Sequence, residues 1–560
     1  MKTLLITICI LATATLNAQN FQWAKAFGGL GNDVGNSIAV DTFGNVYTTG
    51  SFKDTVDFDP GPGTTNLISA GSGYGVFVQK MDPSGHFLWA KAFGGNGYGG
   101  NSIVIDAVGN IYTTGYFAGT VDFDPRAGIA NLVSNGGFDI FVQKMDASGN
   151  FLWAKSFGGY KRVEGYSIAV DASGNVYTTG LFSDTADFDP GAGIYNLGSN
   201  GLYDIFVQKM DPSGNFLWAK AFGSPFRAQG NSIATDASGN VYTTGNFFGT
   251  VDFDPGAGIA NLTAVGGRDI FVQKMDASGN FLWAKAFGGS GVDYGVSITV
   301  DASGNVYTTG RFESTVDFDP GAGIANLISA GSSDIFVQKL DATGNLLWAK
   351  SFGGFAFDVG NSIAVDASGN VYTAGSFQLT VDFDPGPGIA NLISAGVSDI
   401  FIQKMDASGN FLWAKAFGGY GYDGGTSLAV DALGHVYTTG YFGNTVDFDP
   451  GAGTANLSSA GTYDVFVHKM SQTTVGIIEH SVEDEIEIYP NPSPSYFSID
   501  LGETLSEVKI SIRDVNGKLV DAYEYNKAQR LNLDFDAPAG IYFLSLESKE
   551  QRAVFRLVKQ

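Results

Sequence analysis

The chain has 560 residues, of which 44% are hydrophobic and 16% are charged, so it can form several cores and is too apolar to be disordered. Its formal net charge of -25 argues against binding to nucleic acid or to an anionic membrane, because contacts to phosphate need clustered Lys and Arg. The 78 glycines and 44 phenylalanines indicate many short strands joined by tight turns, and they predict an all-β protein.

Residues 1–18 have the pattern of a secretory signal peptide. Lys2 precedes an apolar run from Leu4 to Leu16 that is too short to span a membrane, and a small residue, Ala18, ends the segment. The single cysteine, Cys9, lies within it, so we expect the mature chain to have no disulfide, thiolate metal ligand or cysteine nucleophile. No later stretch approaches the roughly 18 apolar residues of a membrane helix, and we therefore expect an exported protein without a transmembrane segment.

Residues 19–470 repeat one pattern of about 65 residues. All seven tryptophans stand in copies of the phrase FLWAKAFGG. A second phrase, beginning NS or a close variant, recurs with a period of 65, and its serines are Ser37, Ser102, Ser167, Ser232, Ser297, Ser362 and Ser427. The two periods predict seven copies of one supersecondary unit.

Each repeat predicts four strands. In the repeat that begins at Ser232, the phrases SIATD and VYTTGNF flank an ASGN turn, and DIFVQKMD and FLWAKAF flank another. Such a turn offers a side chain that bonds to the backbone and a glycine for positive φ, so each pair predicts a β-hairpin. The long phrase TVDFDPGAGIANLTAVGGR connects the two hairpins.

Seven four-stranded sheets bury both faces when they pack around an axis, which predicts a β-propeller, with a linear solenoid as the alternative. The ends of the array favour the ring. It opens with an isolated fourth strand, Phe21–Phe27, and it ends after a third strand, Asp464–Met470, that lacks a fourth. We therefore predict a seven-bladed β-propeller in which the N-terminal strand closes the last blade, and we expect a monomer.

The phrases GNVYTTG, DIFVQKMD and LWAK resemble the SBBP family of bacterial β-propeller repeats, over Phe21 to Met470. That resemblance implies the fold and export, and it carries no reaction. We interpret the tryptophans, which alternate with Phe and Lys on the fourth strand, as packing between blades rather than as a platform for sugars.

Residues 471–484 lack the repeat and are interpreted as a linker. Residues 485–560 contain IEIYPNPSPSYFSIDL, VKISIRDVNGKLV and LDFDAPAGIYFLSLES, whose alternating runs are broken by Pro-rich and Asn516-Gly517 turns and predict a small β-sandwich. These phrases resemble the C-terminal sorting domain of the type IX secretion system. The resemblance implies a secreted or cell-surface protein of a Bacteroidota-type bacterium, with the secretion machinery as its partner and this domain removed after export.

The phrase DFDP recurs in every repeat and offers carboxylates to a cation such as Ca²⁺. An Asp-initiated turn is the interpretation that we prefer, because two carboxylates this far apart in water repel only weakly and need no ion. Three loops, starting at Gly28, Gly288 and Gly418, resemble the calcium-binding GGxGxDxUx nonapeptide. They stand a blade apart instead of stacking, so we interpret them as flexible loops and expect no cofactor or metal.

The four histidines do not form a catalytic pattern. His86 and His435 lie in hairpin turns, His468 replaces the glutamine of its sibling strands, and His480 lies in the linker. Since no Ser-His-Asp arrangement, zinc spacing or phosphate loop is present, we predict that the protein is not an enzyme.

The loops that enter the first strands differ between repeats, whereas the ASGN turns are expected to form a uniform rim at the other end. Variation in surface loops favours recognition, and drift is the alternative. We predict a non-enzymatic binding or adhesion protein whose ligand, an extracellular glycan or protein, contacts Tyr160, Arg162, Phe226, Arg227, Tyr420 and Tyr422. The alternative function is a secreted hydrolase or lyase that acts on polysaccharide or peptide.

Overall fold

In the computed structural model, the described residues are 18–69, 73–126, 128–473, 486–489, 491, 493, 496–514, 518–538, 540–548 and 552–559. Every regular element within these ranges is a β-strand. The described residues contain no helix that is long and apolar enough to cross a membrane. The chain divides into two compact units, and the larger one spans Asn20–Ser471. Most of the predicted signal peptide and linker, residues 1–17 and 474–485, lies outside the described residues.

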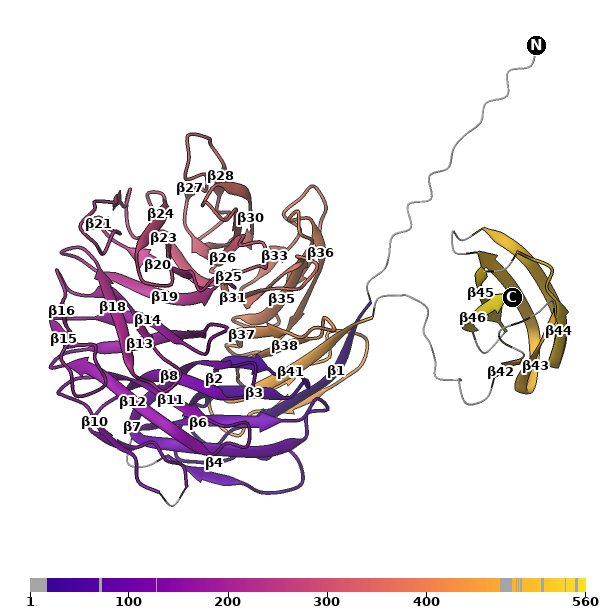
Figure 1. Cartoon of the computed structure of the whole chain (residues 1–560), viewed down its shortest axis with the longest axis horizontal. Helices are drawn as coiled ribbons and strands as arrows, with labels where there is room; N and C mark the ends of the chain where they lie inside the picture. Colours follow the sequence, from indigo (N-terminus) through magenta and orange to yellow (C-terminus); the bar gives the residue numbers. More distant parts are fainter. Residues whose placement is uncertain are drawn as a thin grey trace, which may run out of the picture. The chain divides into compact units, whose positions relative to one another are not determined.

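Each repeat supplies four long strands that pair in the order first, second, third and fourth, antiparallel to their neighbours (Figure 1). The first strands are β2 (Val34–Val40), part of β7 (Phe87–Ile105), β13 (Val163–Val170), β19 (Ala228–Thr235), β25 (Tyr294–Val300), β31 (Val359–Val365) and β37 (Gly424–Val430). The second strands are β3 (Val46–Phe52), β8 (Ile111–Phe117), β14 (Val176–Phe182), β20 (Val241–Phe247), β26 (Val306–Phe312), β32 (Val371–Phe377) and β38 (Val436–Phe442).

The third strands are β6 (Tyr74–Met81), β11 (Asp139–Met145), β17 (Asp204–Met210), β23 (Asp269–Met275), β29 (Asp334–Leu340), β35 (Asp399–Met405) and β41 (Asp464–Thr473). The fourth strands are β1 (Ala18–Phe27), the first part of β7, β12 (Phe151–Gly159), β18 (Phe216–Phe222), β24 (Phe281–Phe287), β30 (Leu346–Gly354) and β36 (Phe411–Phe417). Because β7 runs for 19 residues, it serves as the fourth strand of one repeat and the first of the next.

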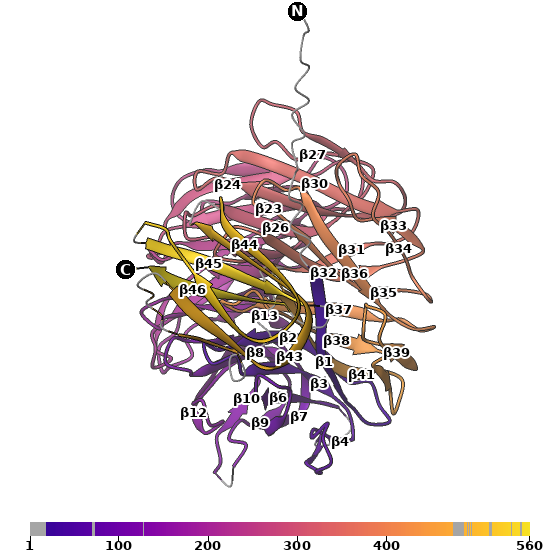
Figure 2. The same ribbon diagram turned by 90° about the vertical axis from the view of Figure 1, so that its right-hand side faces the viewer.

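The connection between the second and third strands holds a short insertion hairpin. These hairpins are β4/β5 (Thr55–Asp57, Asn66–Ile68), β9/β10 (Thr120–Asp122, Asn131–Val133), β15/β16 (Thr185–Asp187, Asn196–Gly198), β21/β22 (Thr250–Asp252, Asn261–Thr263), β27/β28 (Thr315–Asp317, Asn326–Ile328), β33/β34 (Thr380–Asp382, Asn391–Ile393) and β39/β40 (Thr445–Asp447, Asn456–Ser458). In Figure 1, the hairpins β15/β16 and β27/β28 lie at the outer edge of the array, and Figure 2 shows the molecule turned by 90°.

The turns explain why the strands pair as they do. In the turn from β19 to β20, the Asp236 carboxylate accepts the amides of Ser238 and Asn240, both at 2.9 Å. Gly239 has a φ of +77°, a conformation that costs glycine little, and its amide closes the turn on the Asp236 carbonyl at 2.9 Å. The local sequence therefore favours a tight turn in each hairpin.

The two ends of the array meet. The N-terminal strand β1 pairs with β41, so the last sheet has the order β37-β38-β41-β1, as the sequence predicts. The first strands contact one another in chain order, and β2 also contacts β37, which joins the first repeat to the last (Figure 1). This arrangement of repeated antiparallel sheets is consistent with a β-propeller.

Aromatic side chains fill the space between neighbouring repeats. Phe27 packs on Phe58 with ring centroids 5.2 Å apart, and Phe58 packs on Phe77 at 5.1 Å. The same cluster contains Val46 of the first repeat and Val465 of the last, so its core is shared by two repeats.

The tryptophans also link one repeat to the next. Trp413 is buried and the other six are half-buried. Trp218 Nε1 donates to the carbonyl of Ala277 at 3.3 Å, in the turn between the third and fourth strands of the following repeat. The tryptophans therefore pack between repeats, as predicted.

The second unit is a separate antiparallel sheet. Its strands are β42 (Glu487–Tyr489), β43 (Tyr496–Asp514), β44 (Leu519–Asp534), β45 (Gly540–Glu547) and β46 (Arg552–Lys559), in the order β42-β43-β45-β46, with β44 also paired to β43. The alternating residues Phe497 and Ile499 are fully buried in its core with Leu544 and Leu557. The predicted Asn516-Gly517 turn lies outside the described residues, and the strands on either side of it pair through Arg513 and Leu519.

Candidate binding surface

The strand order defines two opposite edges of the array. Because the four strands of a repeat are antiparallel, the turns after the first and third strands lie at one edge, which we call the hairpin rim. The insertion hairpins and the links from one repeat to the next lie at the other edge, which we call the loop rim. Asp236–Asn240 is a turn of the hairpin rim, and residues 223–227 form a link of the loop rim.

The hairpin rim carries a repeated network of charged and aromatic side chains. Tyr242 donates its hydroxyl to Asp236 Oδ2 at 2.9 Å, and Lys274 Nζ lies 4.9 Å from the centroid of the Tyr242 ring. Burial raises the pKa of Tyr242, and hydrogen bonds from Asn240 and Tyr242 outweigh burial and hold the pKa of Asp236 below its usual value. Since an equivalent Lys–Tyr contact is present in every repeat, the network is structural.

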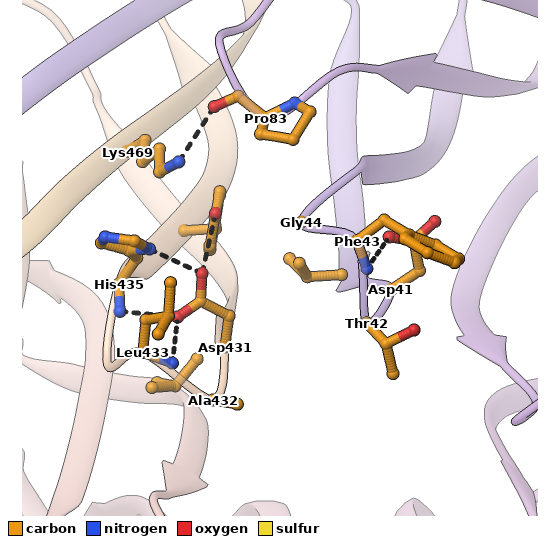
Figure 3. A pocket seen from close by; sticks show the side chains of 13 residues that line it. Asp41, Thr42, Phe43, Gly44, Pro83, Asp431, Ala432, Leu433, His435 and Lys469 are labelled. Atoms are coloured by element: carbon orange, nitrogen blue, oxygen red, sulfur yellow. Dashed lines mark hydrogen bonds and ion pairs between the residues drawn. The ribbon is translucent and has the colours of Figure 1, made fainter.

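A pocket of about 340 Å³ opens on the hairpin rim between the last and first repeats (Figure 3). Phe43 and Leu433 stand on its two sides and are 82% and 78% exposed. His435 Nδ1 lies 2.7 Å from Asp431 Oδ2, and Lys469 donates to the Pro83 carbonyl at 2.9 Å.

The hairpin rim is therefore not uniform, and the expectation that it would be was wrong. Phe43, Val108 and Leu433 occupy the turn position where the other four repeats have serine, and they belong to the last, first and second repeats, which are neighbours in the array. A second pocket, of about 510 Å³, lies between Phe43 and Val108. The phrases DTFGN, DAVGN and DALGH already carry this signal in the sequence.

The DFDP phrase forms an Asp-initiated turn, which is the interpretation that the sequence favoured. Asp57 Oδ1 accepts the amides of Asp59 at 3.1 Å and Thr65 at 2.8 Å, while Val56 and Phe58 on the other face are fully buried. The carboxylates are thus bonded to backbone donors. Among the described residues, no three His, Cys, Asp or Glu side chains come together as metal ligands would.

The glycine-rich links hold buried carboxylates. Asp33 Oδ2 accepts the amide of Gly29 at 2.7 Å and Oδ1 accepts that of Lys53 at 2.9 Å, which supports a structural interpretation of this loop. Burial raises the pKa of Asp33 to about 6. On the neighbouring third strand, Asp464 Oδ1 is buried and has no hydrogen-bond partner among the described residues.

The predicted contact residues all lie on the loop rim. Tyr160, Phe226, Tyr420 and Tyr422 are 81%, 48%, 89% and 51% exposed. Strands β13 and β19 contact each other. The links that precede them carry Tyr160, Arg162, Phe226 and Arg227. Tyr420 and Tyr422 precede β37 and lie elsewhere on the rim. The structure therefore places the first four residues on the links of two neighbouring repeats, and it places the last two on another link.

Tyr203 joins two of these residues, and sequence reasoning missed it. The Arg162 and Arg227 guanidinium carbons lie 5.9 and 4.8 Å from the centroid of its ring. Arg162 also bonds to the buried carboxylate of Glu164, whose other oxygen accepts the Tyr166 hydroxyl at 2.7 Å. The bond to Glu164 raises the pKa of Arg162, so this guanidinium stays charged.

The histidines occupy the positions of other repeats' polar residues. His435 bonds to Asp431 as Asn240 does to Asp236. His468 is fully buried and its Nε2 lies 3.1 Å from the Phe448 carbonyl, where its siblings place a glutamine amide. These two histidines therefore replace structural residues.

Comparison with known proteins supports the two resemblances. A family model described as Beta-propeller repeat (SBBP) matches residues 22–51, 152–181, 217–246 and 282–311. A second, described as Secretion system C-terminal sorting domain, matches residues 487–560. Both predicted families are thus confirmed, and the sorting domain indicates type IX secretion.

Two curated proteins are similar to parts of the chain. One is the uncharacterized WD repeat-containing protein L264 of Acanthamoeba polyphaga mimivirus, 24% identical over 75% of this chain and 36% of its own length. The other is the regulatory protein FlaEY of Caulobacter vibrioides, 32% identical over 25% of this chain and 14% of its own length. The chain thus spans little more than a third of the first relative and less of the second.

Proposed function

We propose that this chain, which carries beta-propeller repeats and a C-terminal sorting domain, is an exported, non-enzymatic β-propeller. It binds an extracellular glycan or protein through its loop rim. The observation that carries the proposal is the contrast within the array. The frame of strands, Tyr–Lys contacts and tryptophans repeats almost unchanged, while exposed aromatic residues and arginines vary on the loop rim.

We further propose that the array has seven blades. The seven repeats of the sequence, the pairing of β1 with β41 and the contact of β2 with β37 support this count. For the second unit we propose a small β-sandwich, because the long strand β43 shifts register between Asp500 and Leu505, where a bulged strand can bend its sheet back on itself.

Export is proposed to begin at a signal peptide in residues 1–18 and to end at the cell surface or in the medium. The sorting domain supports this route. The mature propeller would then meet ligands outside the cell.

A non-enzymatic role is supported by the chemistry of the polar groups described above. The carboxylates with raised pKa, such as Asp33, are bonded to backbone amides, and the Asp431–His435 pair has an Asp–Asn equivalent in another repeat. A secreted hydrolase or lyase is the alternative, and the pocket beside His435 is where its site would be sought.

The test is an array of glycans and extracellular proteins probed with the purified full chain. Each bound glycan or protein is then incubated with the chain, and reducing ends, unsaturated products and peptide fragments are measured. Binding without product release is expected. Release of products by the wild type, lost in the His435→Asn variant, would contradict the non-enzymatic role.

A further inference from the structure

Arginines gather on one arc of the loop rim. In the array the arginines are Arg126, Arg162, Arg227, Arg268 and Arg311, and the last four belong to three consecutive repeats. We define these four, with Tyr203, Tyr294 and Phe357, as the arginine arc. Such a concentration of positive charge is unexpected in a chain with a net charge of -25.

A second tyrosine is flanked by arginines in the same way as Tyr203. The Arg268 and Arg311 guanidinium carbons lie 5.5 and 4.4 Å from the centroid of the Tyr294 ring, and Arg268 also donates to the Tyr294 hydroxyl at 2.6 Å. Arg311 lies 4.4 Å from the Phe357 ring of the next repeat. The aromatic rings hold the guanidinium groups in place, which lowers the entropy lost when they bind a ligand.

The two halves of the arc meet across a single sheet. Arg227 precedes Ala228 and Arg268 precedes Asp269, and both Ala228 and Asp269 pair with Phe247 in the register of β20. Two strand spacings of roughly 4.8 Å therefore place these backbones about 10 Å apart. The adjoining Asn246 is fully buried, and neither its amide nitrogen nor its oxygen has a partner among the described residues.

Three of the four arginines form no close ion pair among the described residues. Within the described part of the chain, the ion pairs of this region are Arg162 with Glu164 and Lys161 with Asp184, and none includes Arg227, Arg268 or Arg311. The nearby carboxylate of Asp293 is buried against the amides of Gly289 and Glu313. Two like charges on one ring repel each other, and an anion bound between them would relieve that repulsion.

We propose that the arginine arc binds an anionic glycan, a polymer with a carboxylate or sulfate on its repeating unit. Guanidinium groups bind such oxyanions with paired hydrogen bonds. A polymer suits the arc because its successive anions would meet arginines on successive repeats, and the exposed rings of Tyr160 and Phe226 can stack on sugar faces. This inference rests on the proposed function, in which the loop rim is the binding face.

The test measures dissociation constants of the full chain for polygalacturonate, dextran sulfate and neutral dextran of matched length. Binding to polygalacturonate, dextran sulfate or both is expected and identifies the source of the anion, while neutral dextran should not bind. Arg268→Ala and Arg311→Ala should each weaken binding about tenfold or more, because each removes charge-assisted hydrogen bonds. Arg311→Lys keeps the charge and should lose less.

Two controls separate a lost contact from a lost fold. Lys53→Ala removes a charge from the loop rim of the first repeat, Ser238→Ala alters the hairpin rim, and neither should change binding. Unchanged affinity in the folded Arg268→Ala and Arg311→Ala variants would overturn the inference. If a neutral glycan or a protein binds instead, the inference fails while the proposed function stands, and if nothing binds, both fail. Equal affinity for double-stranded DNA, with the same loss in the variants, would overturn the assignment to a glycan.

Discussion

The backbone amide of Ile38 donates a hydrogen bond of 3.2 Å to Oγ of Ser427, although the two residues are 389 positions apart in the sequence. The same bond joins consecutive repeats, for example from Ile103 to Ser37 at 3.2 Å and from Leu428 to Ser362 at 3.0 Å. The Ile38–Ser427 bond thus joins the last repeat to the first in the way that every other pair of neighbours is joined.

Closure of the array should depend on β1. Phe27 is buried in the core shared by the first and last repeats, so Phe27→Ala should lower the free energy of unfolding by about 3–5 kcal/mol. Phe43→Ala, at an exposed position, is the matched control and should have little effect. Deleting Phe21–Phe27 should lower the melting temperature further and promote association through the exposed edge of β41. Unchanged melting and a monomeric profile on size exclusion would contradict closure by this strand.

The buried imidazole of His468 should make the array sensitive to acid. Burial lowers its pKa from 6.5 to about 3, so below pH 6.5 the unfolded chain binds a proton that the folded chain does not. The stability that this neutral histidine contributes is therefore lost progressively as the pH falls from 6.5 towards 3. His468→Gln, the residue of the sibling repeats, should raise the melting temperature relative to the wild type by an amount that grows from pH 7 to pH 4. A constant difference over this range would exclude the titration.

Asp334 should have the opposite effect. Burial raises its pKa from 3.8 to about 6, and its Oδ1 has no hydrogen-bond partner among the described residues. The folded chain therefore binds the proton more tightly, and the contribution of this group to stability is greatest below pH 3.8 and is lost as the pH rises through 6. Asp334→Asn should melt at a higher temperature than the wild type at pH 7, with the difference shrinking by pH 4. Calorimetry of His468→Gln and Asp334→Asn at four pH values measures how each difference in melting temperature from the wild type changes with pH. The two differences should change in opposite directions.

The signal for export across the outer membrane should lie in the C-terminal unit. A chain truncated after Asp484 keeps the whole repeat array and loses the sorting domain. In a host with type IX secretion, the truncated chain should accumulate in the periplasm while the full chain reaches the surface or medium. Cell fractionation with antibody detection measures the location of each chain. Equal delivery of both chains to the surface or medium would show that the export signal lies outside the C-terminal unit.

Substitutions on the loop rim should weaken ligand binding, and substitutions on the hairpin rim should leave it unchanged. Once the array experiment identifies a ligand, alanine at Arg162, Arg227 or Tyr422 should weaken its binding. Arg162 and Arg227 should act together, because both guanidinium groups lie at the ring of Tyr203. Ser173→Ala, Ser238→Ala and Ser303→Ala on the hairpin rim are the controls. Loss of binding in the controls alone would reverse the assignment of the two rims.

The sequence by itself determined the repeat, the four strands of each unit and the two rims. These features are local: Asp236, Gly239 and Asn240 form their turn through bonds within five residues, and alternation decides that Val56 and Phe58 face the core. The antiparallel order then follows from the turns. The two family resemblances were equally readable, because they rest on contiguous phrases.

Only the tertiary structure decided which residues of different repeats meet. Nothing in the chain near Tyr203 or Tyr294 predicts that each would lie beside two arginines. Likewise, Asp33 and Asp464 are both buried because the link of one repeat packs against the third strand of its neighbour. Such contacts depend on the twist and angle between packed sheets, which arise from the whole array and leave no periodic pattern in the sequence.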